Sequence, residues 1–198
     1  RPFLSAPGAT GASTPLAPDL VGAGFDALAD PFAKPSDTTG ALGDSFYVAA
    51  VNTQMAVYDR NGTQVVAPIP LSQLHVSSTG LFVFDPKVIY DPYRDTFVLV
   101  YLVQQNSPRL SRIISVAIPN ATASDPTTWC AVSFKGDQVP GGTAAWADYP
   151  GIGFNETHVT ITTNMFTLPT GTARFLYSQV MTIDKVGLYD CNQPMPTP

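Results

Sequence analysis

The feature that most constrains this chain is a hairpin pattern that occurs three times along its 198 residues. The clearest copy runs from Asp148 to Phe166, where a short stretch, a tight turn at Phe154–Glu156 and a second stretch follow one another. In the second stretch, side chains alternate between two faces with a period of two, which is typical of a β-strand. Similar units begin at Gly40 and Asp85, so the pattern predicts a repeat protein.

Strands are expected in all three repeats. In repeat one they lie near Ser45–Val51, Met55–Asp59 and Gln64–Pro68; in repeat two near Lys87–Tyr90, Thr96–Val103, Arg112–Ile118 and Trp129–Phe134; in repeat three near Gly151–Phe154, His158–Asn164 and Phe175–Ile183. Asn61-Gly62 separates two of these strands, and Asn-Gly is the strongest short hairpin signal because both residues tolerate positive φ. Repeat two therefore predicts a four-stranded antiparallel meander, the unit of a propeller blade.

The predicted fold class is all-β, a propeller-like array of about three four-stranded antiparallel blades in an incomplete ring, with a β-sandwich as the alternative. The predicted domains are a Pro/Gly/Ala-rich extended arm at 1–36, repeats at about 37–84, 85–145 and 146–191, and a Pro-rich tail at 192–198. A closed ring needs roughly four to eight blades. We therefore expect the remainder of a longer chain, or other copies of this one, to complete it.

Composition limits the expected partners and the expected location of the protein. Charged residues make up 13% of the chain and its net charge is −5, so nucleic acid is not an expected partner. No apolar run approaches the ~18 residues of a membrane span. Two cysteines, Cys130 and Cys191, occur in a chain with few lysines, which favours a disulfide over two free thiols. Sequons at Asn61, Asn120 and Asn155 are consistent with glycosylation and an extracellular or cell-surface location.

Four sequence blocks carry a family resemblance, and they are Asp37–Ala41, Phe84–Asp91, Asp148–Phe166 and Val180–Lys185. In this order they resemble a group of secreted, mainly bacterial, β-propeller-like proteins of unestablished activity. The resemblance covers most of the chain between the arm and the tail. It implies a propeller fold and export, and a chain that continues past the last residue given.

A degenerate Asp box strengthens the likeness to sialidase-type propeller repeats. Ser124–Trp129 occupies the place of such a box between two strands, although it lacks the glycine and its Trp129 comes one residue early. In a turn of this kind an aspartate side chain accepts backbone N–H bonds. We therefore expect Asp125 to cap the turn and Trp129 to pack beneath the blade.

Catalytic candidates are carboxylates at strand starts and turns, because glycoside hydrolysis requires two of them about 5–10 Å apart. The candidates are Asp85, Asp148 and Glu156. Asp85 and Asp148 precede innermost strands that we take to be equivalent, so both are expected to accept backbone N–H bonds in the same turn. Positions that recur in a repeat usually serve the repeat itself, which favours this structural role.

Ligand-binding candidates are few. Trp146 and Tyr149 lie in the loop that enters repeat three, where an exposed pair of rings would stack on a sugar, or else would plug the sheet. Asp91 and Asp95 place two carboxylates and backbone carbonyls in one loop, which suits calcium. No other cofactor is expected.

The sequence thus favours a non-enzymatic, secreted or cell-surface scaffold or binding module for a glycan, a protein or further copies of itself. The alternative is a carbohydrate-active enzyme, glycosidase- or sialidase-like, with carboxylates at the mouth of the propeller channel. An open array leaves two sheet ends uncovered. We expect the arm to cover one of them, and an apolar interface above ~1,000 Å² to cover the other.

Overall fold

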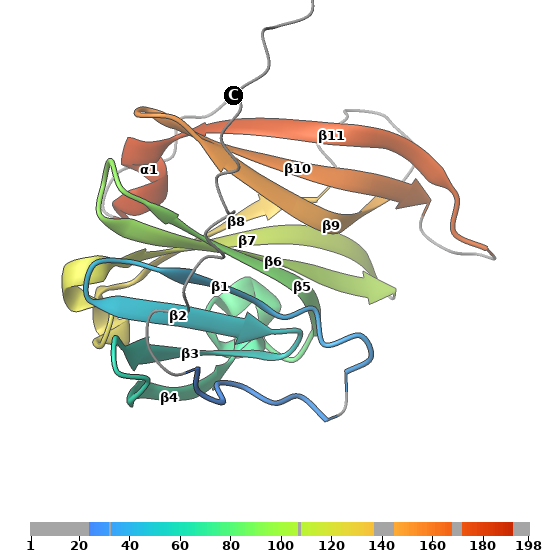
Figure 1. The fold of residues 1–198 in the computed structure, drawn as a ribbon. Coiled ribbons are helices and arrows are strands. Elements are labelled where there is room, and N and C mark those ends of the chain that lie inside the picture. Colours follow the sequence, from blue (N-terminus) through green and yellow to red (C-terminus); the bar gives the residue numbers. More distant parts are fainter. Residues whose placement is uncertain (1–23, 32, 107, 137–144, 168–171, 192–198) are drawn as a thin grey trace, which may run out of the picture.

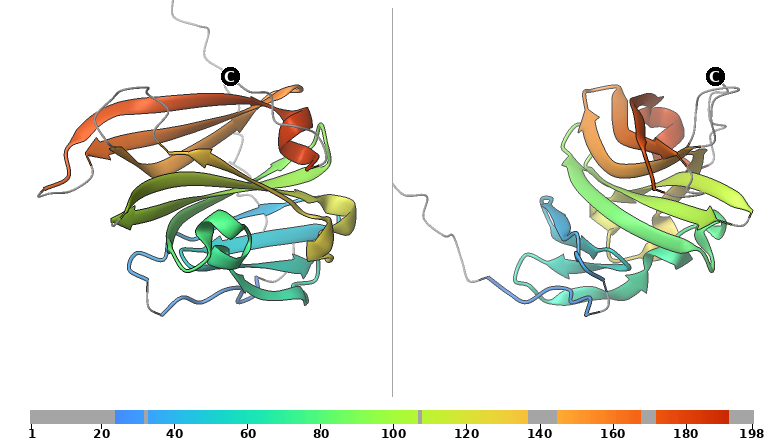
Figure 2. Two further views of the ribbon diagram at one scale, coloured as in Figure 1. Left: turned by 180° about the vertical axis from the view of Figure 1, so that it is seen from behind. Right: turned by 90° about the vertical axis from the view of Figure 1, so that its right-hand side faces the viewer.

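The protein is described by a computed structural model, which covers residues 24–31, 33–106, 108–136, 145–167 and 172–191. Three antiparallel sheets lie on one another as successive layers, and a short helix follows the last strand (Figure 1). The same layering is visible from behind and from the side (Figure 2). The fold is therefore all-β and propeller-like, and the predicted fold class is confirmed.

Each sheet is a meander in which consecutive strands pair in order. Blade 1 contains β1 (Thr39–Leu42), β2 (Phe46–Val51), β3 (Gln54–Asp59) and β4 (Gln64–Pro70); blade 2 contains β5 (Phe82–Asp91), β6 (Thr96–Asn106), β7 (Arg109–Pro119) and β8 (Cys130–Lys135); blade 3 contains β9 (Ala145–Phe154), β10 (His158–Thr167) and β11 (Phe175–Asp184), followed by α1 (Lys185–Tyr189). The described part of blade 3 thus has three strands where the other blades have four. The first strands of the blades are neighbours, because β1 lies against β5 and β5 against β9.

Blade 2 forms the central layer, and its sequence shows why. Every residue of β6 from Thr96 to Val103 is buried, so the strand reads as a continuous apolar run rather than an alternation. A strand with both faces covered is expected to read in this way. Phe97, Leu99, Tyr101 and Val103 pack toward blade 1, while Val98, Val100 and Leu102 pack toward blade 3.

The described end of the arm covers the outer face of blade 1. The ring of Phe25 lies 6.0 Å from that of Tyr47 and 5.1 Å from that of Tyr58. Leu28 packs on the same cluster, and the Gln54 side chain donates to the Ala29 carbonyl at 2.9 Å. The expectation that the arm covers one end of the array is met for these residues. Residues 1–23 of the arm and the tail 192–198 lie outside the described residues.

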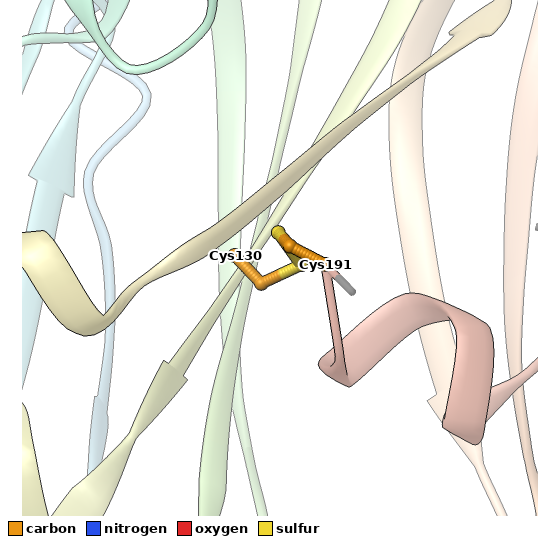
Figure 3. Close-up of a disulfide and its surroundings, with 2 residues drawn as sticks. All are labelled: Cys130 and Cys191. Carbon is orange, nitrogen blue, oxygen red and sulfur yellow. A yellow bond between two sulfur atoms is a disulfide. The ribbon is translucent and has the colours of Figure 1, made fainter. Parts of the chain in front are cut away.

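A disulfide joins blades 2 and 3. Cys130, the first residue of β8, is bonded to Cys191, which follows α1 (Figure 3). The bond closes a sequence separation of 61 residues. The predicted pairing is confirmed, and it fastens the end of blade 3 to the outer strand of blade 2.

Candidate functional site

The candidate site lies where the inner strands β1, β5 and β9, the first strands of the three blades, begin. In each blade one residue just before the regular strand pairing has a positive φ. Asp37, Asp85 and Tyr149 each have a positive φ, of 45°, 51° and 48°. Each lies two residues before a regular pair with the next strand, formed by Thr39, Lys87 and Gly151 respectively. The three residues are therefore structurally equivalent.

This equivalence corrects the sequence interpretation by one residue. Asp85 corresponds to Tyr149, not to Asp148, so Asp85 and Asp148 do not play the same part in the repeat. Aligning the repeats on Pro86 and Pro150, which directly follow the two left-handed residues, gives the correct register. An aspartate tolerates this region of φ better than most residues, whereas tyrosine there is uncommon.

Hydrogen bonds connect these positions from blade to blade. The side-chain nitrogen of Asn52, which follows β2, donates to the Asp37 carboxylate, and its oxygen accepts from the backbone N–H of Asp85 at 2.6 Å. The Asp85 carboxylate in turn accepts from the backbone N–H of Tyr149 at 3.0 Å. The expectation that Asp85 accepts a backbone N–H is met, but the donor belongs to the next blade rather than to its own turn.

Asp85 and Asp148 also act on each other. Asp85 lies on β5 and Asp148 on β9, and each affects the pKa of the other. The pKa of Asp85 is raised to about 6, chiefly by burial; the hydrogen bond from Tyr149 lowers it, and the nearby Asp148 and Asp37 raise it. Burial also raises the pKa of Asp148, while the hydrogen bond from Asp85 lowers it. Both pKa values are therefore raised, and burial is the largest cause in each case.

Aromatic rings line the same end of the inner strands. We call Phe82, Phe84, Trp146, Phe166 and Phe175 the aromatic strip, because consecutive ring centroids lie 5.3, 5.9, 5.6 and 5.8 Å apart. The strip runs from β5 in blade 2 across all three strands of blade 3. Its two ends are open, since Phe82 is 66% exposed and Phe175 is 56% exposed.

Tyr149 adds a further exposed ring. Its side chain is 64% exposed, and the Lys87 ammonium lies 4.7 Å from the ring centroid. Trp146 is only partly exposed, and its indole N–H is buried without a hydrogen-bond partner. We call Phe82, Phe84, Asp85, Trp146, Asp148 and Tyr149 the rim. Four residues that the sequence singled out, Asp85, Trp146, Asp148 and Tyr149, therefore belong to one site.

The other catalytic candidate lies elsewhere. Glu156 is exposed in the turn between β9 and β10, beyond the opposite end of β9 from Asp148. The structure therefore does not bring it to the rim. Among the described residues, no group of three His, Cys, Asp or Glu side chains is arranged to hold a metal ion.

The proposed calcium loop uses its carboxylates for other contacts. Asp91 is fully buried, and it accepts from the backbone N–H of Tyr93 at 3.0 Å and from the Tyr189 hydroxyl at 2.8 Å. The Lys185 ammonium lies 2.6 Å from the same carboxylate, although its geometry does not make a hydrogen bond. Asp95, which is exposed, accepts from the Tyr90 hydroxyl. The geometry therefore makes Asp91 the partner of a buried lysine rather than a calcium ligand.

The degenerate Asp box has the structural role that the sequence predicted. The Asp125 carboxylate accepts from the backbone N–H of Thr127 at 3.0 Å and from its hydroxyl at 2.7 Å. Trp129 packs on the core between blades 1 and 2. The sequons differ in access, since Asn61 and Asn155 are exposed but Asn120 is 3% exposed. A glycan on Asn120 is incompatible with the folded chain.

Comparisons with known proteins identified no related protein. No family model, no curated protein and no solved structure matches this chain. The resemblance to secreted propeller-like proteins stays a prediction. In the part of the chain that the structure describes, no helix has the length and apolar character to cross a membrane.

Proposed function

We propose that this chain is an exported, non-enzymatic binding module whose rim and aromatic strip bind a neutral glycan. The observation that carries the proposal is the aromatic strip, which presents exposed rings beside the hydrogen-bonding groups of Asp85 and Asp148. Aromatic faces stack on sugar rings, and carboxyl groups bind their hydroxyls. The carboxyl pair and the net charge of −5 disfavour an acidic sugar.

Export is supported by the chemistry of the chain. A disulfide between Cys130 and Cys191 persists in oxidising compartments, and it is rare in reducing ones. Asn61 lies in an exposed hairpin turn, so its sequon is accessible to a glycosylating host. The proposed location is therefore extracellular or at the cell surface.

The test is a binding measurement with neutral oligosaccharides by titration calorimetry. Phe82→Ala and Phe175→Ala remove the two exposed ends of the strip, and each is expected to weaken binding about tenfold, the loss of one stacking contact. Tyr93→Ala is the matched control, because Tyr93 is 60% exposed but lies in the turn after β5, away from the rim. Melting curves of each variant confirm folding. Equal affinities for all three variants would show that the aromatic strip is not part of the binding site.

The second candidate is a carbohydrate-active enzyme, and the observation that favours it is the raised pKa of Asp85. A carboxyl that stays protonated near pH 6 is able to act as a general acid. However, the two carboxyls act on each other at short range, whereas a glycosidase separates them by about 5–10 Å to admit the substrate. Release of new reducing ends from a bound oligosaccharide, abolished by Asp85→Asn, would favour the enzyme over the binding module.

Self-association is the remaining part of the prediction. The arm already packs on the outer face of blade 1, which leaves the outward face of blade 3 for a further blade or copy. That face carries Thr160, Thr162 and Ser178 together with the exposed Val180, so a partner there would meet hydroxyl groups around one apolar side chain. Light scattering at micromolar concentration separates a monomer from a dimer.

A further inference from the structure

The outer strand of blade 3 has an open edge. Among the described residues, the strand order of this blade ends at β11, which pairs with β10 on one side and with no strand on the other. Figure 1 shows β11 at the outer margin of the layered sheets. An open edge presents a row of backbone N–H and C=O groups to which another strand can add.

The outer strands of the other two blades carry features that discourage such pairing. β4 contains Pro68 and Pro70, and proline has no N–H to donate to a neighbouring strand. β8 is six residues long, ends in Lys135, and is fastened by the disulfide at Cys130. β11 is ten residues long and contains no proline, and its one charged residue is Asp184 at its end. Blade 3 therefore lacks the protection that the other two outer edges have.

The charges at the two ends of β11 favour a second copy of the same strand as its partner. Arg174, which directly precedes the strand, and Asp184, its last residue, are both exposed. Two antiparallel β11 strands bring the Arg174 end of each copy to the Asp184 end of the other, so opposite charges meet at both ends. A parallel pair would bring like charges together at each end. Charge therefore favours the two-fold, antiparallel arrangement.

The side chains of β11 also indicate the register. Residues that pair across a sheet lie on the same face, and Val180 lies on the outward face, opposite Thr162 of β10. An irregularity near the start of β11 leaves Tyr177–Asp184 as its regular part. A two-fold axis at Val180 uses nearly all of this part. It also sets Val180, which is 64% exposed, against its own copy, and such a β-branched pair stabilises a sheet.

We propose that β11 pairs antiparallel with β11 of a second copy of this chain, centred on Val180, so that the two third blades form one continuous sheet. The proposal rests on the self-association part of the proposed function, for which it names the surface, and it is independent of what the rim binds. One pair of strands is smaller than the ~1,200 Å² of a standard stable interface, so the dimer is expected to form at micromolar concentration.

Cysteine substitution of the full chain tests the register. In Val180→Cys the two introduced thiols lie opposite each other in the dimer, with Cα atoms about 4.5–5.5 Å apart, a spacing that a disulfide spans. The matched control is Thr162→Cys, since Thr162 is on the same face but one strand further from the edge. In the proposed dimer its two copies lie ~14 Å apart, three strand spacings. Mild oxidation is expected to give a covalent dimer on a non-reducing gel for Val180→Cys only.

Light scattering over a range of micromolar concentrations tests the association itself. The parent chain is expected to show a monomer–dimer equilibrium. Arg174→Glu places like charges at both ends of the strand pair, and it is expected to weaken the dimer about tenfold at low ionic strength. Lys34→Glu makes the same change in net charge at an exposed position before blade 1, and it should follow the parent.

The outcomes separate this proposal from the broader one. A parent chain that stays monomeric at every concentration would overturn self-association as a whole. A parent dimer combined with Thr162→Cys forming as much covalent dimer as Val180→Cys, or more, would overturn the edge pairing alone and would assign the contact to another surface. An Arg174→Glu dimer as stable as that of Lys34→Glu would contradict the antiparallel match of charges.

Discussion

Blades 2 and 3 have the same backbone register but opposite chemistry on corresponding faces. Val100 pairs with Lys87 in blade 2, and Thr162 pairs with Gly151 in blade 3. Lys87 and Gly151 each lie two residues after the residue with positive φ, so Val100 and Thr162 are matching positions. Around Val100, the face that packs on blade 3 is buried and mostly aliphatic, and includes Val98, Leu102 and Ile113. In blade 3 the matching positions are Thr160, Asn164 and Ser178; the exception is the buried Ser115 of blade 2, which matches the exposed Val180.

This difference between the two faces shows how the array passes from a buried central blade to a terminal blade with a polar outer face. Blade 2 is held by packing on both faces, whereas the described strands of blade 3 face a core on one side only. A terminal repeat with a polar outer face is a common way to make such an array soluble. The interface predicted for this end stays a prediction, and blade 3 depends on its attachments to blade 2.

The largest effect is expected from the disulfide. Replacing Cys130 and Cys191 by serine removes a bond that closes 61 residues, and the chain-entropy model gives a loss of about 4 kcal/mol in the free energy of unfolding. Urea unfolding of parent and double variant measures the loss. A loss below about 1 kcal/mol would contradict the chain-entropy account of this bond. Reducing the parent protein is the matched control.

The next effect comes from the buried ion pair. Lys185→Met leaves the Asp91 carboxylate buried without its cation and should cost about 3 kcal/mol, because Asp91 keeps the donors of Tyr93 and Tyr189. Thermal unfolding reports the loss. The double variant Lys185→Met/Asp91→Leu should recover part of it, since no uncompensated charge remains. A double variant as unstable as the single one would mean that packing, not charge, decides the effect.

The sharpest comparison is a reciprocal exchange. Val100→Thr buries a hydroxyl in the core between blades 2 and 3, and it should cost about 2 kcal/mol. Thr162→Val makes the reverse change at the matching exposed position, and it should alter stability by no more than about 0.5 kcal/mol. Denaturant midpoints of the two variants, measured side by side, test the difference. Equal losses would show that the outward face of blade 3 is also covered in solution.

Much of the fold was predictable because its signals are local. The Asn61-Gly62 turn is present with Gly62 at φ 82°, the first three predicted strands of repeat two fall inside β5–β7, and the fourth begins one residue before β8. β1 was given no strand bounds, although the hairpin unit that begins at Gly40 covers most of it, because Thr39–Leu42 contains a glycine and offers little strand propensity. β9 begins six residues earlier than expected, at Ala145 instead of Gly151, since small residues at its start obscure the alternation.

The site was predictable only in part. Trp146 and Tyr149 were found because aromatic residues in a loop are conspicuous, but the strip was not, since its rings come from four strands. The partner of Asp85 was assigned to its own turn because nothing local indicates a bond to Tyr149, 64 residues away. Asp91 was taken for a calcium ligand because its contact with Tyr189 spans 98 residues, and lysine is seldom buried.

The disulfide also determines how the chain would respond to mechanical force. Tension applied to the two ends of the chain passes from Cys130 directly to Cys191 and bypasses everything between them, namely most of β8, all of β9–β11 and α1. At ~3.4 Å per extended residue, a loop of 61 residues keeps about 200 Å of chain out of the load path. Blade 1 and the first strands of blade 2 would unravel under pulling, while the backbone of blade 3 would carry no tension.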